Sequence, residues 1–96
     1  HVLGMTKDSS ILVLSGLDAD EGFKHNLPYY YLYSFRFGRR TIRSWRVYLP
    51  AGKAFWNTPV YSLEENALAW VLYDEQHPQS CDIYRSDIHG AKLRLV

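Results

Sequence analysis

Residues 28–37, PYYYLYSFRF, place six aromatic rings in ten positions, and this stretch decides the fold class. Side chains alternate between the two faces of a β-strand. One face carries the rings of Tyr29, Tyr31, Tyr33, Phe35 and Phe37. The other face carries Tyr30, Leu32, Ser34 and Arg36. Because aromatic residues favour pleated sheets, the stretch predicts a strand whose five-ring face is buried between stacked sheets.

Further short apolar segments flank this strand and alternate with turn residues. Residues 41–49, TIRSWRVYL, follow it after a turn that contains Gly38, which predicts a β-hairpin. A polar loop is predicted over 17–27 and another over 75–80. The remaining strands are predicted at 1–5, 10–16, 54–62, 67–74, 81–87 and 91–96. No window shows a helical period, so the sequence predicts an all-β fold.

Length and composition are those of one small globular domain. The 96 residues are 47% hydrophobic and 22% charged, which predicts a single all-β unit over 1–96. Eleven basic against ten acidic residues create no strong field toward nucleic acid or membranes. No apolar run approaches the length of a membrane-spanning helix. The chain begins with His1 rather than Met, so we expect it to be a fragment of a longer protein.

The two halves of the chain resemble each other in sequence, as in an internal repeat. Residues 6–14 align with 62–70 at an offset of 56, Tyr33 aligns with Tyr84 at 51, and Gly38 aligns with Gly90 at 52. The repeats cover 2–49 and 54–96. Such internal self-similarity is typical of repeat architectures. The sequence therefore predicts two tandem four-stranded antiparallel meanders.

Residues 59–96 resemble one blade of the β-propeller repeats of TolB-like and WD-repeat-like proteins. Blades of this family show a Ser-Pro-Asp-Gly turn, an apolar strand, Asp-Ile-Tyr on the third strand and a second glycine turn. Here the matching segments are 62–66, 82–84 and 89–90, although Leu63 and Asn66 replace the proline and glycine of the first turn. In residues 2–49, Lys7 and Ser9 or Ser10 make the same replacement. The resemblance implies two propeller blades and favours an extracytoplasmic, periplasmic location.

A propeller blade has two apolar faces, so the resemblance implies further blades or self-association. It also implies a non-catalytic scaffold that binds a protein or peptide through the loops 17–28, 50–53 and 74–80. Two alternatives stay open: a propeller segment of a prolyl-oligopeptidase-like serine peptidase whose catalytic domain lies elsewhere, and a small free-standing β-sandwich binding module. The candidate binding residues are Tyr29, Tyr30, His25, His77, Arg39 and Arg40.

The arginines between 36 and 46, interleaved with aromatic residues, are the best case for a nucleic-acid surface. Arg39 and Arg40 fall in the hairpin turn, however, and Arg43 and Arg46 fall on opposite faces of their strand. A solvated hairpin is therefore favoured over nucleic-acid binding.

No catalytic residue, cofactor or metal site is predicted. The acidic segment 18–22 has its glycine at the wrong spacing for a calcium loop, and the histidines lack zinc-binding spacing. Gly-x-Ser-x-Gly is absent, and so is a phosphate-binding glycine loop. The single Cys81 allows no internal disulfide, and we expect it to be a small buried hydrophobic residue.

Overall fold

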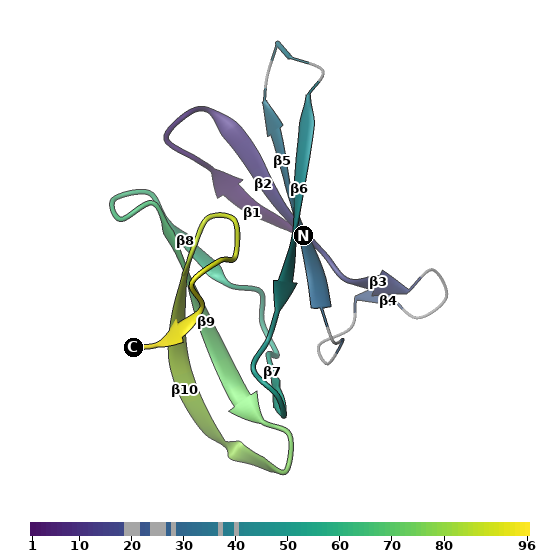
Figure 1. Ribbon diagram of the computed structural model, residues 1–96, viewed down its shortest axis with the longest axis vertical. Coiled ribbons are helices and arrows are strands. Elements are labelled where there is room, and N and C mark those ends of the chain that lie inside the picture. Colours follow the sequence, from purple (N-terminus) through teal and green to yellow (C-terminus); the bar gives the residue numbers. More distant parts are fainter. Residues whose placement is uncertain (19–21, 24–26, 28, 37, 40) are drawn as a thin grey trace.

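A computed structural model describes residues 1–18, 22–23, 27, 29–36, 38–39 and 41–96 (Figure 1). The first sheet has the strand order β1-β2-β5-β6, and every neighbouring pair is antiparallel. Its strands are β1 (Val2–Met5), β2 (Ser10–Ser15), β5 (Tyr29–Arg36) and β6 (Ile42–Tyr48). The predicted meander and its hairpin at Gly38 are confirmed. The described residues contain no helix that is long and apolar enough to span a membrane.

The second sheet has the order β11-β10-β9-β7, and β8 also pairs with β9. Its strands are β7 (Lys53–Ala54), β8 (Val60–Ser62), β9 (Ala67–Asp74), β10 (His77–Asp87) and β11 (Arg94–Leu95). β7 and β8 pair with opposite ends of β9, so the strand predicted over 54–62 is divided in two. The break contains Phe55, which is buried, and Pro59, which has no N–H to donate to a sheet.

Two predicted loops contain strand. A small hairpin of β3 (Leu17–Asp18) and β4 (Gly22–Phe23) lies within the predicted loop 17–27. β10 begins at His77, which pairs with Asp74, so residues 75–76 form a tight turn. The register then shifts between His77 and Cys81, so the rest of the predicted loop 75–80 is an irregular part of β10. The Gln76 amide stabilises that turn by donating to the Asp74 carboxylate at 2.9 Å.

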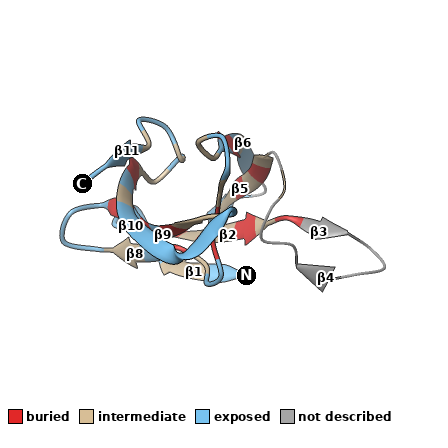
Figure 2. Cartoon of the chain, turned by 90° about the horizontal axis from the view of Figure 1, so that it is seen from below, coloured by how far each residue is buried: buried red, intermediate tan, exposed pale blue. Residues whose placement is uncertain are grey.

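The two sheets pack face to face on one shared core (Figure 2). β1 and β8 also contact each other. Burying a large apolar side chain contributes about 1.5–3 kcal/mol, so this interface holds the fold together. Its buried residues are Leu12, Leu14, Tyr30, Leu32 and Val47 from the first sheet and Phe55, Leu68, Trp70 and Leu72 from the second.

The burial predicted for the five-ring face of β5 is wrong. Tyr30 and Leu32, on the opposite face, are fully buried, whereas Tyr29, Tyr31 and Tyr33 are only half-buried. Phe35 is 37% exposed, and Phe37 lies outside the described residues. The reason lies in the neighbouring strand. Leu14 of β2 pairs with Leu32 and points to the same side of the sheet, so the aliphatic face becomes the core.

The register of the sheets corrects the predicted repeat alignment by one residue. Val13 pairs with Tyr33, and Trp70 pairs with Tyr84, so the predicted offset of 51 along β5 and β10 requires an offset of 57 along β2 and β9. With the offset of 51 kept, the predicted 56 does not hold along β2. Ser9 and Asn66, 57 residues apart, both have positive φ immediately before these strands. The turn from Ser62 to Ala67 is one residue longer than the turn from Thr6 to Ser10. A one-residue slip exchanges the two faces of a strand.

Candidate functional site

The inner face of the first sheet changes from apolar at one end to cationic at the other. Beyond Leu12 and Leu32, the same face carries Ser10, Ser34 and Arg43. Ser34 pairs with Arg43 across β5 and β6, and Ser10 pairs with Arg36 across β2 and β5. Because guanidinium groups are costly to bury without partners, the sheets separate here and leave a pocket of about 210 Å³.

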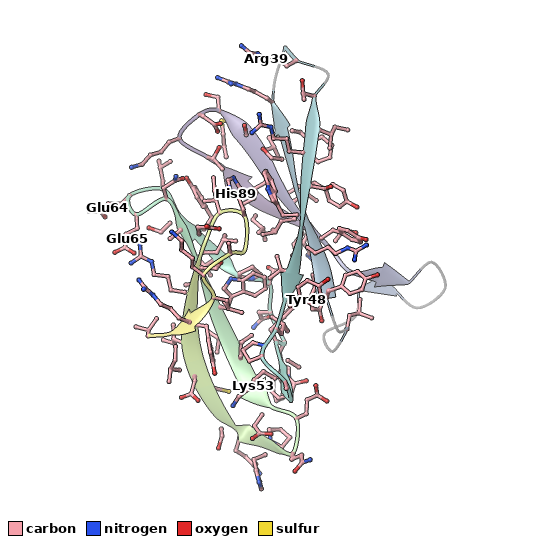
Figure 3. All side chains as sticks on the ribbon, in the orientation of Figure 1. Arg39, Tyr48, Lys53, Glu64, Glu65 and His89 are labelled. Atoms are coloured by element: carbon pink, nitrogen blue, oxygen red, sulfur yellow. The ribbon has the colours of Figure 1, made fainter. Side chains whose placement is uncertain are left out.

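The second sheet closes this pocket with the turn between β10 and β11. His89 of that turn stacks on Trp45 of β6, with ring centroids 4.0 Å apart and an interplanar angle of 19° (Figure 3). The Asp87 carboxylate accepts hydrogen bonds from the amides of His89 and Ala91, both at 2.9 Å. These two bonds hold the turn in shape, and the stacked rings form one wall of the pocket.

Gly90 allows the turn to approach β6 this closely. Its φ is +78°, and a Cβ placed on it would lie 2.2 Å from Val47 Cγ2. Gly38 has the same kind of backbone, with φ +75°, but a Cβ there would have no neighbour within 4 Å among the described residues. Glycine is therefore needed at 38 only for the positive φ of the turn. At 90 it is needed for the positive φ and also for the close contact between the two sheets.

The pocket has an excess of positive charge. Its lining contains Arg36, Arg39 and Arg43 against the single carboxylate of Asp8. None of these three arginines forms an ion pair with any residue that the structure describes. The ion pair seen among the described residues joins Arg85 to Glu65 at 3.7 Å, outside the pocket. Guanidinium groups stay charged at all physiological pH values. The site can therefore attract an anion.

Asp8 is held as a carboxylate at the rim of this pocket. It accepts a hydrogen bond from the Thr6 hydroxyl, and that bond, a further one from Ser10 and the nearby charge of Arg36 lower the pKa of the Asp8 carboxyl. Thr6 Oγ1 also accepts from the Ser10 amide at 3.3 Å. These hydrogen bonds stabilise the turn at 6–10. The one negative charge of Asp8 does not balance the three positive charges of the arginines.

The dimensions of the pocket suit a small anionic group. Sites for drug-sized ligands usually occupy about 300–1,000 Å³. A pocket of about 210 Å³ holds one or two carboxylate or phosphate groups, which guanidinium groups bind through paired hydrogen bonds. No cluster of three His, Cys, Asp or Glu that could hold a metal occurs in the described ranges of the chain.

The structure places the predicted site residues in different environments. Arg39 is exposed and lines the pocket, whereas His77 is exposed at the start of β10 and does not line it. Tyr29 is half-buried on the outer face, where Arg46 lies 5.1 Å from the centre of its ring. His25 and Arg40 fall outside the described residues.

Tyr30 is wrong as a surface binding residue. Its ring is 0% exposed and packs against Phe55 at a centroid distance of 4.8 Å. Its hydroxyl accepts a hydrogen bond from the Leu27 amide at 3.0 Å. Burial raises the pKa of this hydroxyl. Tyr30 therefore belongs to the core, where a partner cannot reach it.

Arg43 and Arg46 lie on opposite faces, as predicted. Arg43 lines the pocket, and Arg46 lies over the rings of Tyr29 and Tyr31 on the outer face. Hydrogen bonds with the hydroxyls of Tyr48 and Tyr31 raise the pKa of the Arg46 guanidinium. Ser34 and Arg36 follow Leu32 at a spacing of two residues on β5, and this spacing is the sequence signal for the cationic end of the inner face.

Two other features of the site region differ from the sequence interpretation. The pairing of His89 with Trp45 has no local signal, because 44 residues separate them in the chain. Cys81 is exposed, so its predicted burial is wrong. It pairs with Tyr73 at the outer side of the second sheet.

No protein-family model matches the chain, and the comparisons with curated proteins and with solved structures gave no match. The resemblance of residues 59–96 to propeller blades therefore stays a prediction. Function has to be argued from the pocket and from the surfaces of the two sheets.

Proposed function

We propose that this chain is a non-catalytic scaffold of the β-propeller type that binds a protein or peptide partner, and that it grips an acidic side chain of that partner. The observation that carries the proposal is that Arg36, Arg39 and Arg43 line one pocket and form no ion pair with any residue in the described part of the chain. Two of them project from paired strands, which hold a binding group in place better than a loop does.

A peptide fits this site better than a nucleic acid does. Nucleic-acid surfaces present a stripe of positive charge that follows several phosphates, usually with exposed aromatic rings for stacking. Here the three arginines line one small pocket, and Arg46 contacts Tyr29 and Tyr31 on the other side of the sheet. The whole chain carries a net charge of only +1.

The second candidate function is a small free-standing β-sandwich that binds its partner in the same pocket. The face-to-face packing of the two sheets on a single core favours it. The two candidates differ in what covers the outer faces of the sheets, and they predict the same ligand chemistry in the pocket.

Fluorescence anisotropy with a labelled Glu-rich peptide tests the proposal. A Gln-rich peptide and single-stranded DNA of equal charge are the reference ligands. Losing one charge-assisted hydrogen bond in a partly exposed pocket costs about 1 kcal/mol, so we expect Arg43→Gln to weaken binding of the acidic peptide about five-fold. Arg46→Gln is the matched control, because Arg46 lies on the same strand and the opposite face.

We expect Arg46→Gln to leave the affinity unchanged. Affinity should also fall as salt is raised, because exposed charges are screened. Equal losses in the two variants would show that the peptide binds outside the pocket. DNA binding tighter than the acidic peptide would favour a nucleic-acid interface and contradict the proposal.

A further inference from the structure

Each sheet buries one face in the shared core and leaves the other uncovered. The outer face of the first sheet, defined by Met5, Ile11, Val13, Tyr33 and Ile42, is half-buried to exposed, with Ile42 59% exposed. The outer face of the second sheet, defined by Ala69, Val71, Cys81 and Ile83, is exposed throughout, with Val71 and Ile83 each 55% exposed. Exposed apolar residues that gather on one face mark interaction surfaces.

The corrected repeat alignment shows what each outer face is equivalent to. On the second sheet, the face that packs on the first carries Tyr61, Leu68, Trp70, Tyr84 and Leu93. The strand pairings align Tyr61 with Met5, and they align Leu68 and Trp70 with Ile11 and Val13. In the same way Tyr84 and Leu93 match Tyr33 and Ile42. All five equivalents are apolar, and all lie on the outer face of the first sheet.

The reverse correspondence also holds. Leu12, Leu14, Tyr30 and Leu32 form the buried face of the first sheet. By the same pairings, Leu12 and Leu14 match Ala69 and Val71, while Tyr30 and Leu32 match Cys81 and Ile83. These equivalents form the outer face of the second sheet. The two sheets thus use opposite faces in the interface between them. The outer face of each sheet is equivalent to the face that the other sheet buries in that interface.

We infer that copies of this chain associate head to tail, with the outer face of the first sheet of one copy packed on the outer face of the second sheet of the next. This contact would repeat the interface that already joins the two sheets within one chain. Because the two mating surfaces differ, the contact is heterologous and leads to a ring or an open filament rather than a two-fold dimer. The inference is independent of the ligand bound in the pocket.

Two variants that each block one outer face test the inference. Tyr33→Glu places a charge on the first outer face, and Val71→Glu places one on the second. A buried unpaired carboxylate opposes association strongly. Sedimentation velocity and light scattering give the mass of each species at about 100 µM chain, where an interface of ordinary size is populated.

We expect the unmodified chain to form species larger than one chain, and each variant alone to be a monomer. An equal mixture should give a single species of twice the chain mass. In that mixture, Tyr33→Glu still offers its intact second face and Val71→Glu its intact first face, and growth stops after one contact. Circular dichroism checks that both variants keep the sheets. If Tyr33→Glu does not fold, Ile42→Glu blocks the same face at a more exposed position.

Four results would overturn the inference. A dimer of Val71→Glu alone would mean that the first outer face pairs with itself. A dimer of Tyr33→Glu alone would mean the same for the second face. A mixture that stays monomeric would show that the two faces are not mates. An unmodified chain that is monomeric at this concentration would show that something other than a second copy covers them.

Discussion

Replacing Gly90 by alanine tests whether the turn between β10 and β11 is held against β6 as the structure shows. The new Cβ would lie 2.2 Å from Val47 Cγ2 and 3.1 Å from both Val47 Cβ and Cγ1. Backbone strain at φ +78° costs about 1–2 kcal/mol for a residue with a Cβ. Forcing an extra methyl group into a packed contact costs about 1–3 kcal/mol more. We therefore expect Gly90→Ala to lower the free energy of unfolding by about 2–5 kcal/mol.

Gly38→Ala is the matched control for this change. Gly38 has φ +75° in the equivalent hairpin, and a Cβ there meets no atom of a described residue within 4 Å. We expect only the backbone strain of about 1–2 kcal/mol. Urea unfolding followed by tryptophan fluorescence measures both variants, because Trp45 and Trp70 lie on the two sheets.

A double-mutant cycle separates the clash from the strain. In the presence of Val47→Ala, which removes both Val47 γ-carbons, Gly90→Ala should cost about 1–3 kcal/mol less than it does alone. Gly90→Ala costing no more than Gly38→Ala, or additive effects of Gly90→Ala and Val47→Ala, would show that the turn does not press on β6. The packing of the second sheet against the pocket would then have to be revised.

Three further predictions concern the core and the rim of the pocket. Tyr30→Ala should lower the free energy of unfolding by about 3–5 kcal/mol, as truncation of a buried aromatic does, and urea unfolding should show a smaller loss for half-buried Tyr31→Ala. Ser86→Ala should cost about 1–3 kcal/mol, because buried Trp70 Nε1 donates to Ser86 Oγ at 2.9 Å and would lose its acceptor; equal stability would show that the bond is dispensable. Because the pKa of Asp8 is lowered on folding, its contribution is present above the unfolded pKa of 3.8 and is lost as the pH falls through the lower folded value. Acid unfolding of Asp8→Asn should therefore show a weaker fall in stability below pH 3.8 than the unmodified chain, and parallel curves would contradict this origin.

Local signals in the sequence predicted most of the strands and the antiparallel order of both sheets. The aromatic residues of 29–36 and a turn glycine at Gly38 were enough to place β5, β6 and their hairpin. Strand type and turn chemistry depend on neighbouring residues, so one sequence reveals them. The placement of Arg43 and Arg46 on opposite faces followed from the way in which successive side chains of a strand point to opposite faces.

Only the tertiary structure decided which face of each strand is buried. β5 is apolar on both faces, so alternation could not choose between the ring face and the face of Tyr30 and Leu32. That choice depends on which residues of β2 and β9 oppose each other across the core, and one extra residue in the turn before β9 reverses the answer. The pocket has the same origin. Trp45 meets His89, and Val47 meets Gly90, only because the two sheets pack face to face and bring together segments more than 40 residues apart.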